Sequence, residues 1–95
     1  MRGMLTDKIQ EKALIFLKRE ISQKELRLYP YIDYCFKNAC QGWSYGKMDL
    51  EEIDVLNKLY EEKHLIHSTE RILVSREFYD FMQDILAIGY VEEFI

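Results

Sequence analysis

Proline and glycine are scarce in this 95-residue sequence, which contains one proline, Pro30, and four glycines. These two residues are the strongest markers of turns and linkers, and no low-complexity stretch takes their place. A chain of this length buries enough surface for one modest hydrophobic core. We therefore expect residues 1–95 to form a single helical domain with no internal boundary.

Long apolar runs are also missing. The longest one covers residues 13–17, whereas about 20 apolar residues are needed to cross a bilayer. Near the start of the chain, Thr6, Asp7 and Lys8 interrupt any apolar stretch that a secretory signal would need. The sequence therefore predicts a cytoplasmic protein that does not enter a membrane.

Cysteine is limited to Cys35 and Cys40. Two cysteines without an export signal indicate reduced thiols rather than a disulfide framework. The spacing between them is at the wide end of that found in structural zinc sites, and His64 and His67 lie closer together than the usual histidine pair. We expect no metal and no other cofactor.

Motifs that carry catalytic chemistry are absent as well. The sequence has no G-x-S-x-G elbow, phosphate-binding glycine loop, H-E-x-x-H zinc motif or calcium loop. One alternative is a Cys35 nucleophile assisted by His64 or His67, because such partners need not be adjacent in sequence. Cys35 shares the helical spacing of the apolar residues around it, however, which is typical of packing. We predict that the protein is not an enzyme.

The first half of the chain contains two helical stripes and one helix breaker. Apolar residues recur every three or four positions over residues 6–20, with Thr6 as a cap. Ser22 and Glu25 form an S-x-x-E capping box that starts the next helix. Pro30 should stop or kink that helix at Tyr29, so that a new segment runs from Pro30 to about residue 40, followed by a loop over 41–48. The residues expected to face the core are Leu5, Ile9, Ala13, Phe16, Leu17, Ile32, Cys35, Phe36 and Ala39. Ile21 is expected to pack on Leu26 as a hydrophobic staple.

In the second half, Asp49 and Glu52 repeat the capping-box pattern, which predicts a helix over 50–63. Residues 64–74 resemble a two-stranded hairpin, or alternatively belong to a single helix from Thr69. Ser75 caps a last helix that reaches Gly89, before an apolar and acidic tail over 90–95. The expected inward residues are Leu50, Ile53, Leu56, Leu59, Tyr60, Phe78, Phe81, Met82, Ile85 and Leu86. The predicted fold is mainly α, a small bundle of about four helices with at most one short hairpin.

Residues 27–47 combine six aromatic side chains with three basic ones. Exposed tyrosine and tryptophan supply large rigid contact area with a polar tip, which suits protein interfaces. The residues expected to bind a partner are Arg27, Tyr31, Tyr34, Trp43 and Tyr45. The alternative is that a small domain uses these rings to fill its core.

Charge is divided unevenly along the chain. Residues 1–47 hold nine Lys and Arg against five Asp and Glu, whereas residues 48–95 hold four against twelve. The order of elements over 50–89 resembles a winged helix-turn-helix, but six acids on the helix before the hairpin would repel phosphates. The preferred function is a non-catalytic protein-interaction or regulatory module. Nucleic-acid binding through the basic first half is the alternative, with Lys8, Lys12, Lys18, Arg19, Lys24 and Arg27 as the phosphate contacts.

Overall fold

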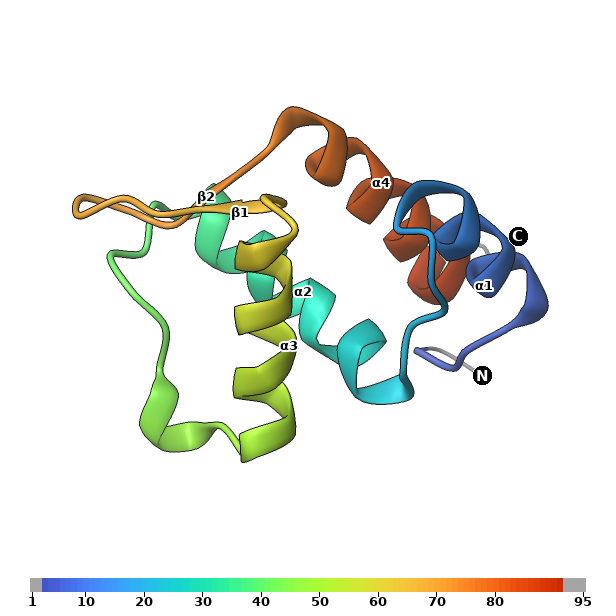
Figure 1. Cartoon of the computed structure of the whole chain (residues 1–95), viewed down its shortest axis with the longest axis horizontal. Coiled ribbons are helices and arrows are strands. Elements are labelled where there is room, and N and C mark those ends of the chain that lie inside the picture. The colour runs from blue at the N-terminus through green and yellow to red at the C-terminus, as the bar shows by residue number, and fades with distance from the viewer. Residues whose placement is uncertain (1–2, 92–95) are drawn as a thin grey trace.

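A computed structural model describes residues 3–91 of the chain (Figure 1). Its α-helices are α1 (Asp7–Phe16), α2 (Gln23–Lys37), α3 (Leu50–Glu61) and α4 (Arg76–Leu86), and its strands are β1 (Leu65–Ile66) and β2 (Leu73–Val74). A single 3-10 turn, η1 (Tyr45–Lys47), precedes α3, and a π-helical turn, η2 (Ala87–Val91), follows α4. This arrangement confirms the predicted fold class, four helices with a short antiparallel hairpin. Of the acidic tail predicted over 90–95, residues 92–95 lie outside the described residues.

All four helices start where the sequence predicts, because each is preceded by a capping side chain. Thr6 accepts a hydrogen bond from the backbone of Ile9, and Ser75 accepts one from Phe78. At the start of α3 the complete capping box forms, with Asp49 and Glu52 each bonded to the other's backbone amide. These bonds satisfy amides that would otherwise lack a partner.

The capping box predicted at the start of α2 forms only in part. Ser22 accepts a hydrogen bond from the amide of Glu25, as expected. The Glu25 side chain does not return to Ser22, however, and instead binds Arg19 and the hydroxyl of Tyr29 inside the protein. Glu25 is therefore a buried charged residue, only 2% exposed, rather than a surface cap.

The helix does not stop at Pro30, so the predicted start of a new segment there is wrong. α2 continues through Pro30 to Lys37 as one element. Proline removes one intrahelical hydrogen bond, a cost of about 3 kcal/mol. Leu26 and Tyr29 before the proline and Ile32 after it are all fully buried, and this burial on both sides offsets the cost.

Helices α2 and α3 end earlier than predicted, each in the same hydrogen-bonded motif. At the end of α2, the amides of Ala39 and Cys40 bond to the carbonyls of Phe36 and Cys35. Ala39 has a φ of 53°, a left-handed conformation usually taken by glycine, and is exposed rather than directed at the core as predicted. Lys63 has the same role after α3, with a φ of 66°.

The first helix is also shorter than the predicted 6–20. It ends at Phe16, and Lys18 follows with a φ of 65°. The linker to α2 is held by Gln10, whose side chain both donates to and accepts from the backbone of Ile21. The linker therefore packs closely against α1, and Leu17 and Ile21 are both buried there.

The hairpin, rather than a helix from Thr69, occupies the segment between α3 and α4. Leu65 pairs with Val74 and Ile66 with Leu73 in antiparallel register. Two further backbone bonds fix the hairpin: the amide of Ile72 donates to the carbonyl of Cys40, and the amide of Ser75 donates to that of His64. The hairpin is thereby tied to the segment that follows α2.

The core lies where α2 crosses between α3 on one side and α4 on the other (Figure 1). Tyr29 from α2 makes edge contacts with the rings of Phe78 and Phe81 from α4. α1 packs against α4 and η2 at the far end of the molecule. Most predicted core residues are buried, with the clear exceptions of Ala39 and Leu50, which is 79% exposed.

Candidate functional site

Trp43 and Tyr31 attach the loop after α2 to the body of the protein. The indole nitrogen of Trp43 donates a 2.9 Å hydrogen bond to the Tyr60 hydroxyl. Its ring contacts that of Tyr31, with centroids 5.8 Å apart, and the Tyr31 hydroxyl accepts a bond from the amide of Ser44. Both rings are half-buried against the core. These two predicted partner-binding residues therefore also contribute to packing.

Tyr45 lies in a hollow between this loop and the hairpin, with a volume of about 180 Å³. We call it the aromatic hollow and define it by Trp43, Tyr45, Tyr60, Ile66 and His67. The rings of Tyr60 and His67 stack 4.2 Å apart and nearly parallel, while Tyr45 and Ile66 are 49% and 43% exposed. Burial raises the pKa of the Tyr45 hydroxyl. The hollow is thus ordered but open.

The other predicted binding residues are distributed elsewhere. Arg27 and Tyr31 line a second hollow of about 320 Å³, together with Lys47 and with Glu52 from the first turn of α3. Tyr34 is 61% exposed on α2 and lines neither hollow. The structure therefore brings Trp43 and Tyr45 together in the aromatic hollow, with Tyr31 beside Trp43, and leaves Arg27 and Tyr34 apart from it.

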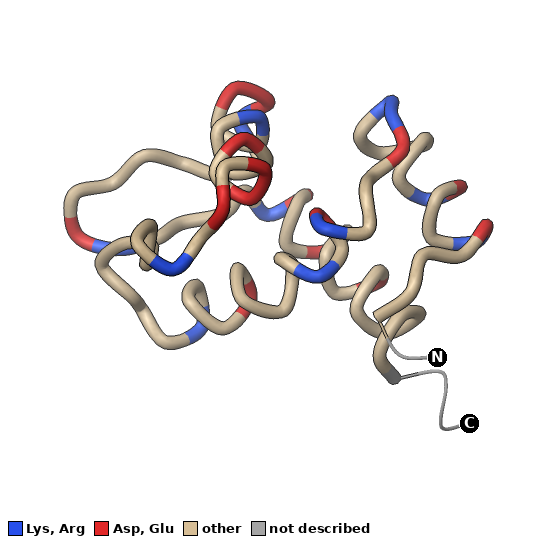
Figure 2. Tube along the Cα trace, turned by 90° about the horizontal axis from the view of Figure 1, so that it is seen from below, with Lys and Arg blue, Asp and Glu red and all other residues tan. Residues whose placement is uncertain are grey.

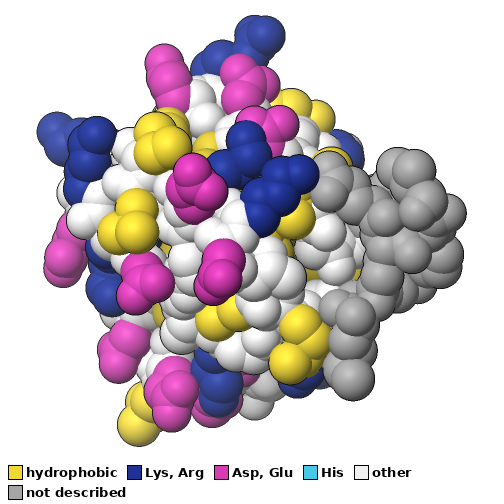
Figure 3. All heavy atoms as spheres, turned by 90° about the vertical axis from the view of Figure 1, so that its right-hand side faces the viewer, with side chains coloured by type: hydrophobic (Ala, Val, Ile, Leu, Met, Phe, Trp, Pro, Cys, Tyr) yellow, Lys and Arg dark blue, Asp and Glu magenta, His cyan; other side chains and the backbone are white. Residues whose placement is uncertain are grey.

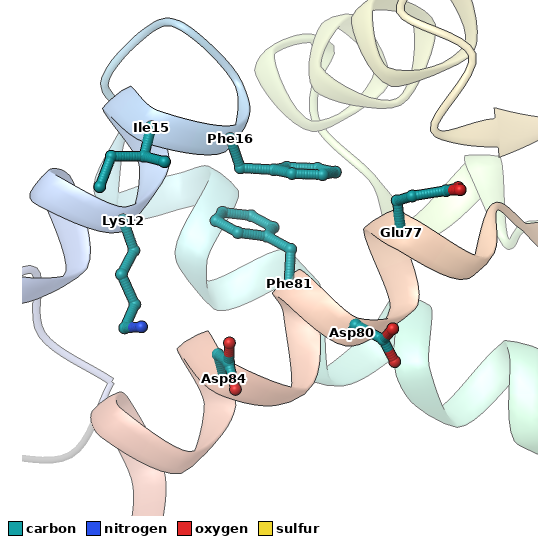
Figure 4. Close-up of a pocket in the computed structure, with 7 residues that line it drawn as sticks. All are labelled: Lys12, Ile15, Phe16, Glu77, Asp80, Phe81 and Asp84. Atoms are coloured by element: carbon teal, nitrogen blue, oxygen red, sulfur yellow. The ribbon is translucent and has the colours of Figure 1, made fainter.

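A further site, which sequence reasoning missed, lies between α1 and α4 (Figure 4). This α1–α4 groove has a volume of about 270 Å³ and is lined by Lys12, Ile15, Phe16, Glu77, Asp80, Phe81 and Asp84. Phe16 and Phe81 stack with their centroids 4.8 Å apart. In Figure 4 these rings lie between the two helices, with the acidic side chains projecting from α4 on one side of them.

A sequence signal for this groove was present. Residues 13–17 are all apolar, but successive helical positions are rotated by about 100°, so five in a row cannot all face one core. Leu14 and Ile15 are the members that point outward, 49% and 67% exposed. The end of the molecule that carries α1 and α4 accordingly shows apolar side chains between charged ones (Figure 3).

Two members of the predicted phosphate-binding set are already paired with acids. Arg19 binds Glu25 and Glu62, and Lys24 binds Asp49. Lys12 lines the acidic α1–α4 groove. On the helix before the hairpin, Glu51, Asp54 and Glu61 are exposed. Figure 2 marks the acidic and basic positions along the whole trace.

In the alternative catalytic arrangement, both histidines make ring contacts with other side chains. His64 lies with its ring against Phe16 and Phe78, and His67 stacks on Tyr60. Cys35 is a buried free thiol, and burial raises its pKa to about 11. Within residues 3–91, no hydrogen bond joins Cys35 to either histidine, and no group of three or more His, Cys, Asp or Glu side chains is placed to hold a metal ion.

Comparison with known proteins returns no matching family model, no similar curated protein and no similar solved structure. Among the described helices, none has the length and apolar character required to cross a membrane. A functional proposal therefore depends on the surfaces themselves.

Proposed function

We propose that this protein is a small non-catalytic interaction module that binds another protein through the aromatic hollow. The observation that carries the proposal is the exposure of Tyr45 beside the rings of Trp43 and Tyr60, whose polar atoms are hydrogen-bonded to each other. Aromatic side chains are enriched among the residues that dominate binding at protein interfaces. Tyr45 and Ile66 supply apolar contact area at the opening of the hollow.

The hydrogen bond between Trp43 and Tyr60 supports this function in two ways. It gives the indole nitrogen a partner, so a protein that covers the hollow does not leave that donor unsatisfied. It also fixes the orientation of both rings before binding. A contact surface that is already ordered loses less conformational entropy in the complex, which favours affinity.

Nucleic-acid binding is the competing function, because the hairpin follows α3 as in a winged helix and exposed rings can stack on bases. The distribution of charge disfavours it. Arg19 and Lys24 are neutralised by carboxylates, and the exposed face of α3 is mainly acidic. Phosphate binding requires basic side chains that are free to replace counterions.

The test is an affinity pull-down from the native cell with quantitative mass spectrometry, using the wild type, Tyr45→Ala and Leu50→Ala. Leu50 is the matched control, because it is exposed but lines none of these hollows. We expect at least one protein partner to be depleted about tenfold by Tyr45→Ala, which corresponds to about 1.4 kcal/mol, and retained by Leu50→Ala.

Two results would contradict the proposal. One is a set of partners that is identical for all three proteins. The other is the absence of any protein partner, combined with micromolar binding of duplex or single-stranded nucleic acid at physiological salt, measured by fluorescence anisotropy. Thermal unfolding followed by circular dichroism controls for misfolding, and both variants should melt close to the wild type.

A further inference from the structure

The floor of the α1–α4 groove is apolar. The stacked rings of Phe16 and Phe81 form its centre, and Ile15 lies beside them with two thirds of its surface exposed. Leu14 is also half-exposed on the same helix. A single exposed apolar residue needs no explanation in a small protein, but adjacent ones beside a ring-lined groove form a surface that a partner can bury.

One edge of this groove, which we call the rim, is acidic. Glu77, Asp80 and Asp84 follow one another on α4 with spacings of three and four residues, which places them along one face of the helix over about 10 Å. In Figure 4, Asp80 and Asp84 project from α4 below the rings, and Lys12 extends down from α1 toward the same lower side of the view. The lining therefore holds three carboxylates and one ammonium group.

These carboxylates are weakly compensated inside the protein. Among residues 3–91, the only ion pair that a rim residue makes is between Asp80 and Arg76, at 3.6 Å. Both members of that pair are more than half exposed, and such pairs contribute little. Glu77 and Asp84 make no ion pair within the described residues. Negative charge thus remains available along the rim.

From this geometry we propose that the α1–α4 groove is a second docking site, which takes a basic amphipathic segment of another protein. Large apolar side chains of the segment cover Ile15 and the ring pair, while lysine or arginine side chains spaced three or four residues apart meet the carboxylates of α4. The groove, at about 270 Å³, lies near the small end of ligand pockets and suits one or two inserted side chains. The acidic rim disfavours an anionic membrane surface as the occupant.

This site is distinct from the function proposed above. The α1–α4 groove shares no residue with the aromatic hollow, so the two surfaces can be altered separately. A module with two such surfaces can bring two proteins together, which a single contact surface cannot do.

The test starts with selection of a random 12-residue peptide library on the purified protein. We expect selected peptides to combine Lys or Arg with Leu, Ile or Phe at helical spacing. A synthetic, fluorescently labelled peptide of the selected sequence is then titrated at low and physiological salt. Its affinity should fall as salt rises, because the contacts with the rim are electrostatic and exposed.

Two pairs of matched variants locate the binding site. Asp80→Lys with Asp84→Lys should weaken peptide binding at least tenfold, whereas Asp54→Lys with Glu61→Lys, which alters exposed acids on α3, should change it less than twofold. Similarly, Ile15→Asp should weaken binding and Leu50→Asp should not, although both replace exposed apolar residues. The lysine variants keep the test decisive even where Ile15→Asp disturbs folding.

Three results would overturn the docking site. The first is selected peptides without basic residues, and the second is equal losses in the groove and control variants. The third is self-association in sedimentation velocity that Ile15→Asp abolishes and Leu50→Asp does not, which would assign the groove to a second copy of this chain. Tyr45→Ala should leave peptide binding unchanged. If Tyr45→Ala alone removes it, the peptide binds the aromatic hollow, and only the groove proposal fails.

Discussion

The guanidinium group of Arg19 lies 3.0 Å from the carboxylate of Glu25, a side chain that is only 2% exposed. Arg19 also binds Glu62, which follows α3, at 2.9 Å, and Tyr29 donates a 2.7 Å hydrogen bond to the second oxygen of Glu25. The linker after α1, the first turn of α2 and the end of α3 are therefore joined through one arginine. The bond from Arg19 also lowers the pKa of Glu62 below its usual value.

We predict that Arg19→Ala destabilises the protein by about 2 to 4 kcal/mol. Loss of one partner of a buried ion pair leaves the other charge uncompensated, and the partial exposure of Arg19 keeps the effect below the upper limit for such changes. Urea unfolding at pH 7 measures the difference. Arg76→Ala is the control, because its pair with Asp80 is largely exposed and should contribute less than about 1 kcal/mol. Equal effects of the two changes would show that the Arg19 pair stabilises the protein no more than an exposed ion pair does.

The second prediction concerns pH and His64. Burial lowers the pKa of His64 in the folded protein, where its ring lies against Phe16 and Phe78. His64 therefore binds a proton more readily in the unfolded chain than in the folded protein. The free energy of unfolding should fall as the pH drops from about 6.5 to the lowered pKa of His64 in the folded protein. The nearby charges of Glu62, Glu25 and Glu77 oppose this effect and that of Arg19 adds to it, but burial dominates.

His64→Phe removes the titrating group while keeping an aromatic ring in the same place. Urea unfolding at several pH values between 5 and 7.5 should show a smaller pH dependence for the variant than for the wild type. At lower pH both proteins should still lose stability, because of Glu62. The pKa of Glu62 is lowered in the folded protein, so its carboxylate stabilises the fold, and this stabilisation is lost when the carboxylate is protonated. An unchanged slope above pH 5 in His64→Phe would contradict the assignment.

Two leucines on α3 give the third prediction. Leu56 is fully buried, whereas Leu50 is 79% exposed. Leu56→Ala should destabilise the protein by about 2 to 5 kcal/mol, the usual range for removing a buried leucine side chain. Leu50→Ala is expected to change the free energy of unfolding by less than about 0.5 kcal/mol. The comparison is made by urea unfolding, and a loss below about 1 kcal/mol for Leu56→Ala would argue against its buried position.

The helix starts were predictable from sequence because a cap acts within one turn. Thr6, Ser22, Asp49 and Ser75 each bond to an amide three residues away, so no distant contact is needed to recognise them. Helix ends were less predictable. They depend on left-handed residues that are not glycine, Lys18, Ala39 and Lys63, and nothing in these side chains distinguishes them from helical positions.

Tertiary packing determined the remaining differences. Pro30 is a strong local breaker, but the buried residues around it keep α2 continuous. Leu50 fits the stripe of α3 by its spacing, yet it stands roughly 120° around the helix from Leu56 and remains exposed. Composition identified the aromatic segment, but it could not show which rings are anchored and which are exposed. Trp43 is anchored by its hydrogen bond to Tyr60, 17 residues further along the chain, whereas Tyr45 is exposed.

The fourth prediction is that the two thiols react at different rates. Cys35 is buried and its pKa is raised to about 11, so very little thiolate exists at neutral pH, whereas Cys40 is only half-buried. In the native protein, labelling with a maleimide or a thiol-exchange reagent at pH 7 should modify Cys40 first and Cys35 much more slowly. Cys40→Ser should remove the faster phase alone. Rapid labelling of Cys35 in that variant would indicate that the end of α2 opens readily.

The last prediction separates the anchoring role of Trp43 from the contact role of Tyr45. Trp43→Ala removes the hydrogen bond to Tyr60 and the packing against Tyr31, so it should destabilise the protein and increase amide hydrogen exchange in residues 41–48. A loss of about 1 to 3 kcal/mol is expected, because Trp43 is only half-buried. Tyr45→Ala removes an exposed side chain that lies outside the described core. The free energy of unfolding of this variant should match that of the wild type within about 0.5 kcal/mol, and amide exchange in residues 41–48 should not increase. If Tyr45→Ala instead loosens the loop as much as Trp43→Ala does, both rings serve to anchor the loop, and a loss of binding in Tyr45→Ala would then report on folding rather than on contact.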